Sequence, residues 1–176
     1  KEVIKKAKKN LKKKDISKNH LIKYLESPKQ GIYYAINIGL DNIDSQGFYM
    51  VLGEGDIIKQ KTNNLKYSMH PMKILDYKLK NNNKVINKFR NLYEGMPYCH
   101  NAIIFKNNNL RYSLKYKISS DYDYFLKYIK RNSLIEEKQM RLEGLEVIFE
   151  SEKGISSKSI FRKNFENFKK LVKAKK

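Results

Sequence analysis

The side chains best suited to chemistry lie in two acidic segments that are far apart along the chain. The first is Gly53-Glu54-Gly55-Asp56, which directly follows the apolar run Phe48–Leu52. In open α/β sheets, ligands bind beyond the carboxyl ends of strands, and an acid at that edge can hold a hard divalent cation through oxygen. Such a cation would neutralise a diphosphate leaving group. A Gly-Asp turn with a solvated carboxylate explains the same residues, and spacing alone favours that simpler interpretation.

The second acidic segment is Asp121-Tyr122-Asp123, at the start of a predicted helix over Asp121–Lys130. A carboxylate at this place can accept a proton from an attacking hydroxyl and so act as a general base. Acids in a first helical turn also interact favourably with the helix dipole. On the residues alone, the helix dipole is a sufficient explanation for both acids.

Two further segments contain polar groups that suit phosphate or sugar oxygens. His100 ends the segment Met96-Pro97-Tyr98-Cys99-His100, and its imidazole can donate a hydrogen bond to such an oxygen. A structural histidine in a loop is the more common case. Ser156 lies in Gly154-Ile155-Ser156-Ser157, before a predicted last helix whose first backbone N–H groups suit phosphate. A serine N-cap explains that segment equally well.

Alternating helices and strands are expected to position these residues. Apolar spacing predicts a helix over Ile32–Leu40, and the run Phe48–Leu52 predicts a buried strand of a parallel sheet. Strands are also predicted over Leu21–Leu25, Lys73–Leu79, Ala102–Phe105 and Leu145–Phe149. This order indicates the α/β fold class. We expect one domain over residues 1–176, with a basic helix at about 158–174.

Composition excludes several classes of protein. The 176 residues hold no run of 18 apolar residues, so no transmembrane helix is expected. The single cysteine, Cys99, excludes an internal disulfide framework and a cysteine-based zinc site. A reducing, cytoplasmic setting is the natural expectation.

The formal net charge of +20 is concentrated at the two ends of the chain. Residues 1–30 contain 11 basic against 3 acidic residues, and residues 151–176 contain 9 against 2. Such ends can contact an anionic membrane surface, although a solvated helix face is the more common explanation. The basic residues are 33 Lys and 5 Arg, whereas nucleic-acid readers usually rely on Arg, so no nucleic-acid partner is expected.

Five segments, taken in order, resemble bacterial family-two glycosyltransferases of the GT-A fold, the kind that build lipopolysaccharide and capsule polysaccharide. The segments are "SPKQGIYYAINIGL" (Ser27–Leu40), "FYMVLGEGD" (Phe48–Asp56), "MPYCHNAIIFK" (Met96–Lys106), "YKISSDYDYFLKYIKR" (Tyr116–Arg131) and "FESEKGISS" (Phe149–Ser157). The resemblance implies a GT-A-like mixed sheet flanked by helices. Because the family normally begins with a strand and an acidic loop that bind the base and ribose, we expect this chain to lack that N-terminal nucleotide-binding segment.

The resemblance also implies a reaction and roles for particular residues. A sugar would pass from a nucleotide-sugar donor to a glycan or lipid-linked acceptor, with inversion at the anomeric carbon. Asp56 would bind a divalent cation, Mn²⁺ or Mg²⁺, on the donor diphosphate, and Asp121 would be the catalytic base. His100, Ser156, Asn37 and Asp123 would bind the substrates. The protein would then act in the cytoplasm or at the inner face of the membrane.

Two other interpretations remain open. One is a basic module that binds nucleic acid or anionic lipid, which predicts a continuous basic face and steep salt dependence of binding. The other is an inactive transferase remnant. The transferase interpretation predicts an acidic spot, with Asp56 and Asp121 within reach of one cavity, inside an otherwise basic shell.

Overall fold

The computed structural model describes residues 23–28, 30–62, 70–80, 82–85, 95–133 and 140–149, with only the backbone for 82–85. Over these ranges the chain has a mixed α/β fold. In chain order the elements are α2 (Ile32–Leu40), β1 (Phe48–Tyr49), β2 (Ile57–Gln60), β3 (Met72–Leu79), β4 (Asn82–Val85), the 3-10 turn η2 (His100–Ala102), β5 (Ile103–Lys106), α3 (Ser120–Asn132) and β6 (Arg141–Phe149).

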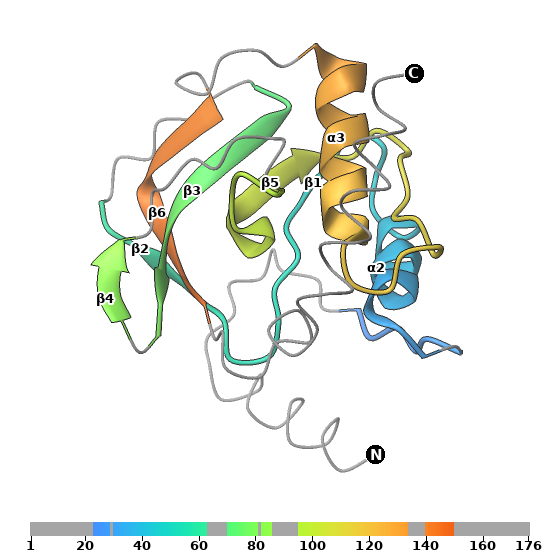
Figure 1. Ribbon diagram of the computed structural model, residues 1–176, viewed down its shortest axis with the longest axis horizontal. Coiled ribbons are helices and arrows are strands. Elements are labelled where there is room, and N and C mark those ends of the chain that lie inside the picture. The colour runs from blue at the N-terminus through green and yellow to red at the C-terminus, as the bar shows by residue number, and fades with distance from the viewer. Residues whose placement is uncertain are drawn as a thin grey trace.

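A curled, mixed sheet forms the centre of the described fold. Its strand order is β1-β5-β3-β6-β2, and β4 pairs with β3 as a hairpin. The β3–β6 pair is parallel and the other pairs are antiparallel. Figure 1 shows α2 and α3 on the side of the molecule where β1 and β5 lie, with β2, β4 and β6 on the other side.

Local sequence explains the limits of the two helices. Gly31, with φ of 129°, precedes α2 in a backbone conformation that side chains disfavour. In α3, Asp121 and Asp123 lie in the first turn and Lys130 and Arg131 in the last, so the charges at both ends complement the helix dipole. Ser133, with φ of 49°, ends α3 in the left-handed conformation typical of helix C-termini.

Two hydrophobic clusters pack on the sheet. In β3, Ile74 belongs to the larger cluster and the next residue, Leu75, to the smaller one with Val147, because successive side chains of a strand point to opposite faces. The larger cluster is rich in aromatic rings, several of them tyrosines from β1, α3 and the chain between β5 and α3. Its aromatic members are Tyr49, Tyr98, Phe105, Tyr112, Tyr124, Phe125 and Tyr128.

The tyrosine hydroxyls in this core have hydrogen-bond partners, as buried phenols require. The Tyr49 hydroxyl donates to that of Tyr124 at 2.5 Å, and the Tyr112 and Tyr124 rings stack with centroids 4.2 Å apart. The Tyr128 hydroxyl lies 2.8 Å from the carbonyl oxygen of Pro71 and 2.9 Å from that of Lys106. These contacts fasten α3 to the sheet.

The structure confirms several predicted elements and corrects others. The helices at Ile32–Leu40 and Asp121–Lys130 are confirmed, as is the strand at Lys73–Leu79. The strands predicted at Ala102–Phe105 and Leu145–Phe149 are present as β5 and β6, with shifted or longer bounds. Of the predicted strand Leu21–Leu25, the described part, residues 23–25, is not a strand.

The prediction of a buried parallel strand over Phe48–Leu52 was wrong. Only Phe48–Tyr49 forms a strand, and it is the antiparallel edge strand β1, paired with β5. Phe48 is exposed, with the Lys73 ammonium 4.0 Å from its ring centre, and Leu52 is exposed as well. The run is apolar because it lies beside the aromatic core, and not because a sheet encloses both of its faces.

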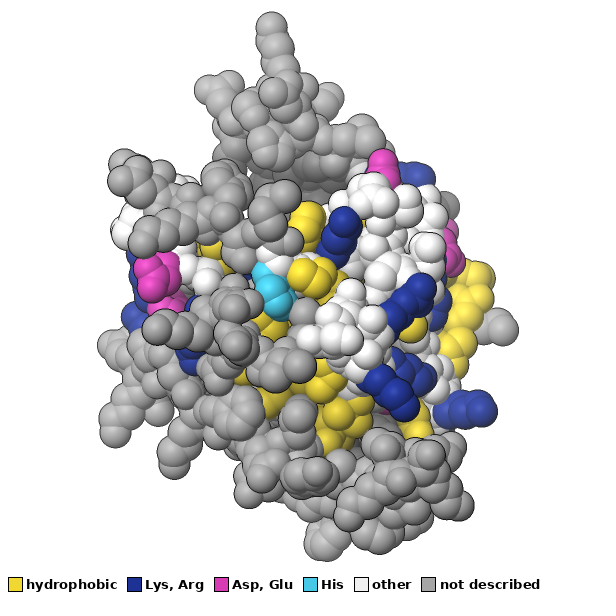
Figure 2. Space-filling model, turned by 90° about the horizontal axis from the view of Figure 1, so that it is seen from above, with side chains coloured by type: hydrophobic (Ala, Val, Ile, Leu, Met, Phe, Trp, Pro, Cys, Tyr) yellow, Lys and Arg dark blue, Asp and Glu magenta, His cyan; other side chains and the backbone are white. Residues whose placement is uncertain are grey.

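The basic helix predicted at about 158–174 lies outside the described residues, as does the N-terminal basic segment up to residue 22. Within the described ranges, neither α2 nor α3 has the length and apolarity needed to cross a membrane. Figure 2 shows Lys and Arg side chains interspersed with hydrophobic and uncharged polar ones over the visible described surface.

Candidate functional site

The acidic segment after β1 forms a tight turn. The backbone N–H of Asp56 donates to the Gly53 carbonyl at 3.3 Å, and the Gly53 N–H donates to Asp56 Oδ2 at 2.7 Å. Gly55 has φ of 91°, which favours glycine at this position. The turn therefore holds the Asp56 carboxylate in one orientation at the end of the chain segment that leaves the core.

A second contact joins this turn to the chain just before β5. The Asn101 amide nitrogen donates to Asp56 Oδ2. Asn101 lies within η2, whose first turn is closed by a hydrogen bond from the Ala102 N–H to the Cys99 carbonyl at 2.9 Å. Asp56 is thus fixed by backbone and side-chain donors from two segments that are distant in sequence.

Cys99 directly precedes η2 and is partly buried. Burial, with added repulsion from the Asp56 and Asp121 carboxylates, raises the pKa of the Cys99 thiol to about 11. Side-chain contacts connect both acids to η2. Asp56 accepts from Asn101, and Asp121 lies 3.4 Å from the hydroxyl of Tyr33, whose ring stacks on Tyr112, the partner of His100.

Asp121 occupies the first turn of α3 and is half-buried. Its Oδ1 accepts the Tyr122 N–H at 2.9 Å and lies 3.4 Å from the Tyr33 hydroxyl, which donates to the Ile118 carbonyl. Burial and the negative charge of Asp121 raise the pKa of Tyr33, so this phenol stays protonated. Tyr33 comes from α2, and its ring stacks on Tyr112 with centroids 5.8 Å apart.

His100 completes this cluster. Its Nε2 lies 2.9 Å from the Tyr112 hydroxyl, and its ring packs against Phe105 and Tyr112. Burial lowers the pKa of His100, and the Asp121 carboxylate opposes that shift only in part. The imidazole is therefore neutral near pH 7.

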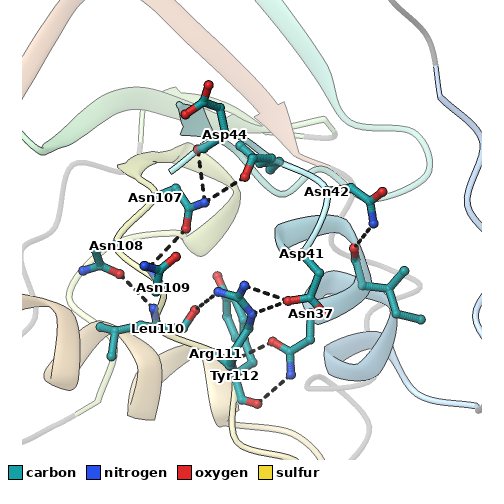
Figure 3. Close-up of polar contacts among 12 residues, drawn as sticks. Asn37, Asp41, Asn42, Asp44, Asn107, Asn108, Asn109, Leu110, Arg111 and Tyr112 are labelled. Carbon is teal, nitrogen blue, oxygen red and sulfur yellow. Dashed lines mark hydrogen bonds and ion pairs between the residues drawn. The ribbon is translucent and has the colours of Figure 1, made fainter. Parts of the chain in front are cut away.

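Asn37 lies on α2, and its amide binds the main chain of Tyr112. The Asn37 amide nitrogen donates to the Tyr112 carbonyl at 2.9 Å, and the Tyr112 N–H donates to Asn37 Oδ1 at 2.8 Å (Figure 3). Arg111 pairs with Asp41 at 2.7 Å, and the Asn107 amide donates to the carbonyls of Ile43 and Asp44. Asn37 was predicted to bind substrate, but the contacts of its side chain instead position Tyr112.

The remaining predicted site residues lie elsewhere. Asp123 pairs with Lys127 at 2.7 Å, one helical turn along α3. Ser156 lies outside the described residues. Within the described ranges, no three His, Cys, Asp or Glu side chains gather as a metal-binding group. The carboxylate oxygens of Asp56 are nevertheless of the type that Mg²⁺ and Mn²⁺ prefer, and such ions commonly combine one or two carboxylates with phosphate oxygens.

Asn101, Tyr112 and Tyr33 contribute to this cluster and were not predicted as site residues. Tyr33 and Asn101 lie within segments that the resemblance had marked, and Asn101 directly follows His100, whereas Tyr112 lies between two of those segments. That adjacency was the only signal for Asn101. Nothing in the sequence pairs Tyr112 with His100, because the contact depends on how the chain after β5 returns to the core.

Comparison with known proteins gives no relative from which a function can be transferred. No family model, curated protein or solved structure matches the chain.

Proposed function

We propose that this chain is a glycosyltransferase domain of the family-two, GT-A type that moves a sugar from a nucleotide-sugar donor to a hydroxyl group of a glycan or lipid-linked acceptor. The observation that carries the proposal is that contacts of Asp56 and Asp121, from distant segments, lead to the neighbouring residues Asn101 and His100: Asp56 accepts from Asn101, and Asp121 lies beside Tyr33, which stacks on the tyrosine bonded to His100. The five-segment resemblance supports it, as does a mixed sheet flanked by helices. The protein would act in the cytoplasm or at the inner face of the membrane.

The two carboxylates have different surroundings, which suit different roles. Asp56 is held by donors from the Gly53 backbone and Asn101, and it would hold the Mn²⁺ or Mg²⁺ ion that neutralises charge on the donor diphosphate. Asp121 lies against Tyr33 at the start of α3 and would accept the proton of the attacking hydroxyl. As that hydroxyl oxygen bonds to the anomeric carbon, the bond to the diphosphate breaks and its electron pair leaves with the phosphate oxygen.

Substitution of each carboxylate tests the proposal. A panel of nucleotide sugars is incubated with the full chain, Mn²⁺ and mixed glycan and polyprenyl phosphate acceptors, and release of nucleoside diphosphate is measured. We expect Asp121→Asn to lower turnover by about 10²- to 10⁴-fold, the usual contribution of a general base. We expect Asp56→Ala to raise the Mn²⁺ concentration needed for half-maximal turnover.

A matched control is Asp44→Asn, which removes an exposed carboxylate that accepts the Gln46 N–H in a loop after α2. It should leave turnover unchanged. Equal turnover in the Asp121→Asn variant and the unaltered protein would remove Asp121 as base, and metal-independent turnover would remove the role of Asp56. Inactivity with every donor, together with salt-sensitive binding to anionic vesicles or nucleic acid, would favour the basic binding module instead.

A further inference from the structure

The ring of His100 has one nitrogen with a partner and one without. Nε2 lies 2.9 Å from the Tyr112 hydroxyl. Nδ1 is buried and has no hydrogen-bond partner among the residues that the structure describes. Buried side-chain nitrogens nearly always have a partner, so Nδ1 is a polar group suited to a ligand atom.

The contact with Tyr112 decides which nitrogen carries the proton. A phenol O–H is a better donor than a neutral imidazole N–H, and the bare ring nitrogen is a better acceptor than the phenol oxygen. The Tyr112 hydroxyl therefore donates to Nε2, which leaves the ring proton on Nδ1. The stacking of Tyr112 on Tyr124, with centroids 4.2 Å apart, and its main-chain bonds to Asn37 keep the phenol in place.

Two tyrosines connect Asp121 to the same ring. Asp121 Oδ1 lies 3.4 Å from the Tyr33 hydroxyl, and the Tyr33 ring stacks on Tyr112, whose hydroxyl bonds His100. The Asp121 charge also acts on His100, yet Nδ1 forms no hydrogen bond to the carboxylate. A hydroxyl group between the two would satisfy both, because its oxygen accepts a hydrogen bond from Nδ1–H while its own proton is donated to the carboxylate. Neither group alone supplies both contacts.

We propose that His100, held as the Nδ1–H tautomer by Tyr112, donates to the oxygen of the acceptor hydroxyl whose proton Asp121 accepts. This rests on the proposed function and assigns the acceptor side of the site to His100, with Tyr112 as its positioning residue. During transfer the hydroxyl proton moves to Asp121, the oxygen bonds to the anomeric carbon, and the diphosphate leaves with the electron pair. His100 keeps its proton throughout. Its N–H occupies one lone pair of the acceptor oxygen while Asp121 holds the hydroxyl proton, so the other lone pair is left to attack the anomeric carbon.

The tautomer can be measured without any substrate. The full chain is labelled with ¹⁵N-histidine, and the ring nitrogens of its three histidines are observed by long-range ¹H–¹⁵N correlation at pH 7.5, with His100→Asn used to identify the His100 signals. We expect His100 to be a single Nδ1–H tautomer, and Tyr112→Phe to produce a mixture. An Nε2–H tautomer in the unaltered protein would overturn the proposal, and an unchanged tautomer in Tyr112→Phe would remove Tyr112 as the positioning residue.

Two isosteric substitutions then test the contact with the acceptor. An asparagine amide nitrogen reaches roughly the place of Nδ1, whereas that of glutamine reaches the place of Nε2. With the nucleotide sugar found active in the panel, we expect His100→Asn to lower transfer to the acceptor by about tenfold and His100→Gln by about 100-fold, with the KM for the donor unchanged. The reverse order, or a raised KM for the donor in both variants, would overturn the proposal.

The two experiments distinguish a failure of this inference from a failure of the proposed function. If no donor is turned over, the proposed function fails, while the tautomer experiment still reports whether Tyr112 sets the proton of His100. If turnover depends on Asp121 but His100→Gln is as active as the unaltered protein, the proposed function stands and the inference fails.

Discussion

At the scale of the residue, the Cys99 thiol can report whether both carboxylates act on one segment of the chain. Its thiol has a pKa of about 11 because it is buried and because Asp56 and Asp121 repel the thiolate. Alkylation proceeds through the thiolate, so this cysteine should react slowly at pH 8. Asp56→Asn and Asp121→Asn should each lower the pKa of the thiol and speed its alkylation by iodoacetamide, by roughly twofold or more.

The measurement is the rate of alkylation of the folded chain, followed by mass spectrometry. Asp44→Asn is the matched control, since Asp44 is not among the charges that act on Cys99. Unfolding in urea should raise the rate in all variants to that of an ordinary thiol. If only one of the two site variants changes the rate in the folded chain, the two carboxylates do not share this segment, and the pairing behind the proposed function is lost.

At the scale of the element, the amide of Asn37 connects α2 to the chain that leaves β5. Asn37→Ala removes two hydrogen bonds and leaves the main-chain N–H and carbonyl of the buried Tyr112 without that partner. Each unsatisfied buried group costs about 1–3 kcal/mol, so we expect the free energy of unfolding in urea to fall by about 2–4 kcal/mol.

Asn42→Ala, in the turn that follows the same helix, is the matched control. The Asn42 amide donates to the Ile38 carbonyl at 2.9 Å, but this bond is exposed, and we expect its loss to cost under about 1 kcal/mol. Equal losses of stability at the two positions would mean that Asn37 does not position Tyr112. The comparison also tests the inference above, because a displaced Tyr112 could no longer fix the tautomer of His100.

The elements that could be predicted from sequence are those whose own periodicity defines them. The apolar spacing of Ile32–Leu40 predicted α2, and the acids and apolar residues of Asp121–Lys130 predicted α3. Tyr124 and Tyr128 of α3 are almost fully buried, but the sequence alone does not identify them as core residues. A tyrosine is found both inside and at the surface of proteins, so its type does not report its burial.

Contacts between distant segments carry no such local signal. The run Phe48–Leu52 has the composition of a central strand, but pairing with β5 alone makes it an edge. At the site, the roles of Asp56 and Asp121 come from the resemblance of their segments and stay a prediction. The bonds of Asn101 to Asp56 and of Tyr112 to His100 depend on the tertiary fold. The sequence positions of an asparagine or a tyrosine do not indicate which distant residue its side chain will bind.

At the scale of the whole molecule, acid sensitivity has two separate sources, Glu146 and His100, which have different contacts. Glu146 on β6 is buried, and burial alone would raise its pKa. Ion pairs with Lys61 at 3.0 Å and Lys78 at 3.1 Å outweigh that effect, so its pKa lies below the ordinary value. His100, in the aromatic cluster, also has a lowered pKa, because burial disfavours its charged form.

The lowered pKa values of Glu146 and His100 both make the folded chain less stable as the pH falls. A group whose pKa is lower in the folded chain binds fewer protons there than in the unfolded chain, so acid favours unfolding. For His100 the loss begins as the pH falls below the ordinary histidine value of 6.5, with a slope of at most about 1.4 kcal/mol per pH unit. For Glu146 it begins below the ordinary value of 4.5. A chain that already carries +20 gains further net positive charge as its carboxylates are protonated. The added repulsion increases the loss of stability below pH 4.5.

We therefore expect the free energy of unfolding to fall in two stages between pH 8 and pH 3.5, measured by urea titration at constant ionic strength. His100→Asn should remove the stage that begins near pH 6.5, and Glu146→Gln should flatten the one below pH 4.5. Each should have little effect on the other, because Glu146 pairs with Lys61 and Lys78 whereas His100 bonds Tyr112. A single stage that both substitutions change equally would show that neither buried group sets the acid response. The uniform repulsion of a highly basic chain would then be the better explanation.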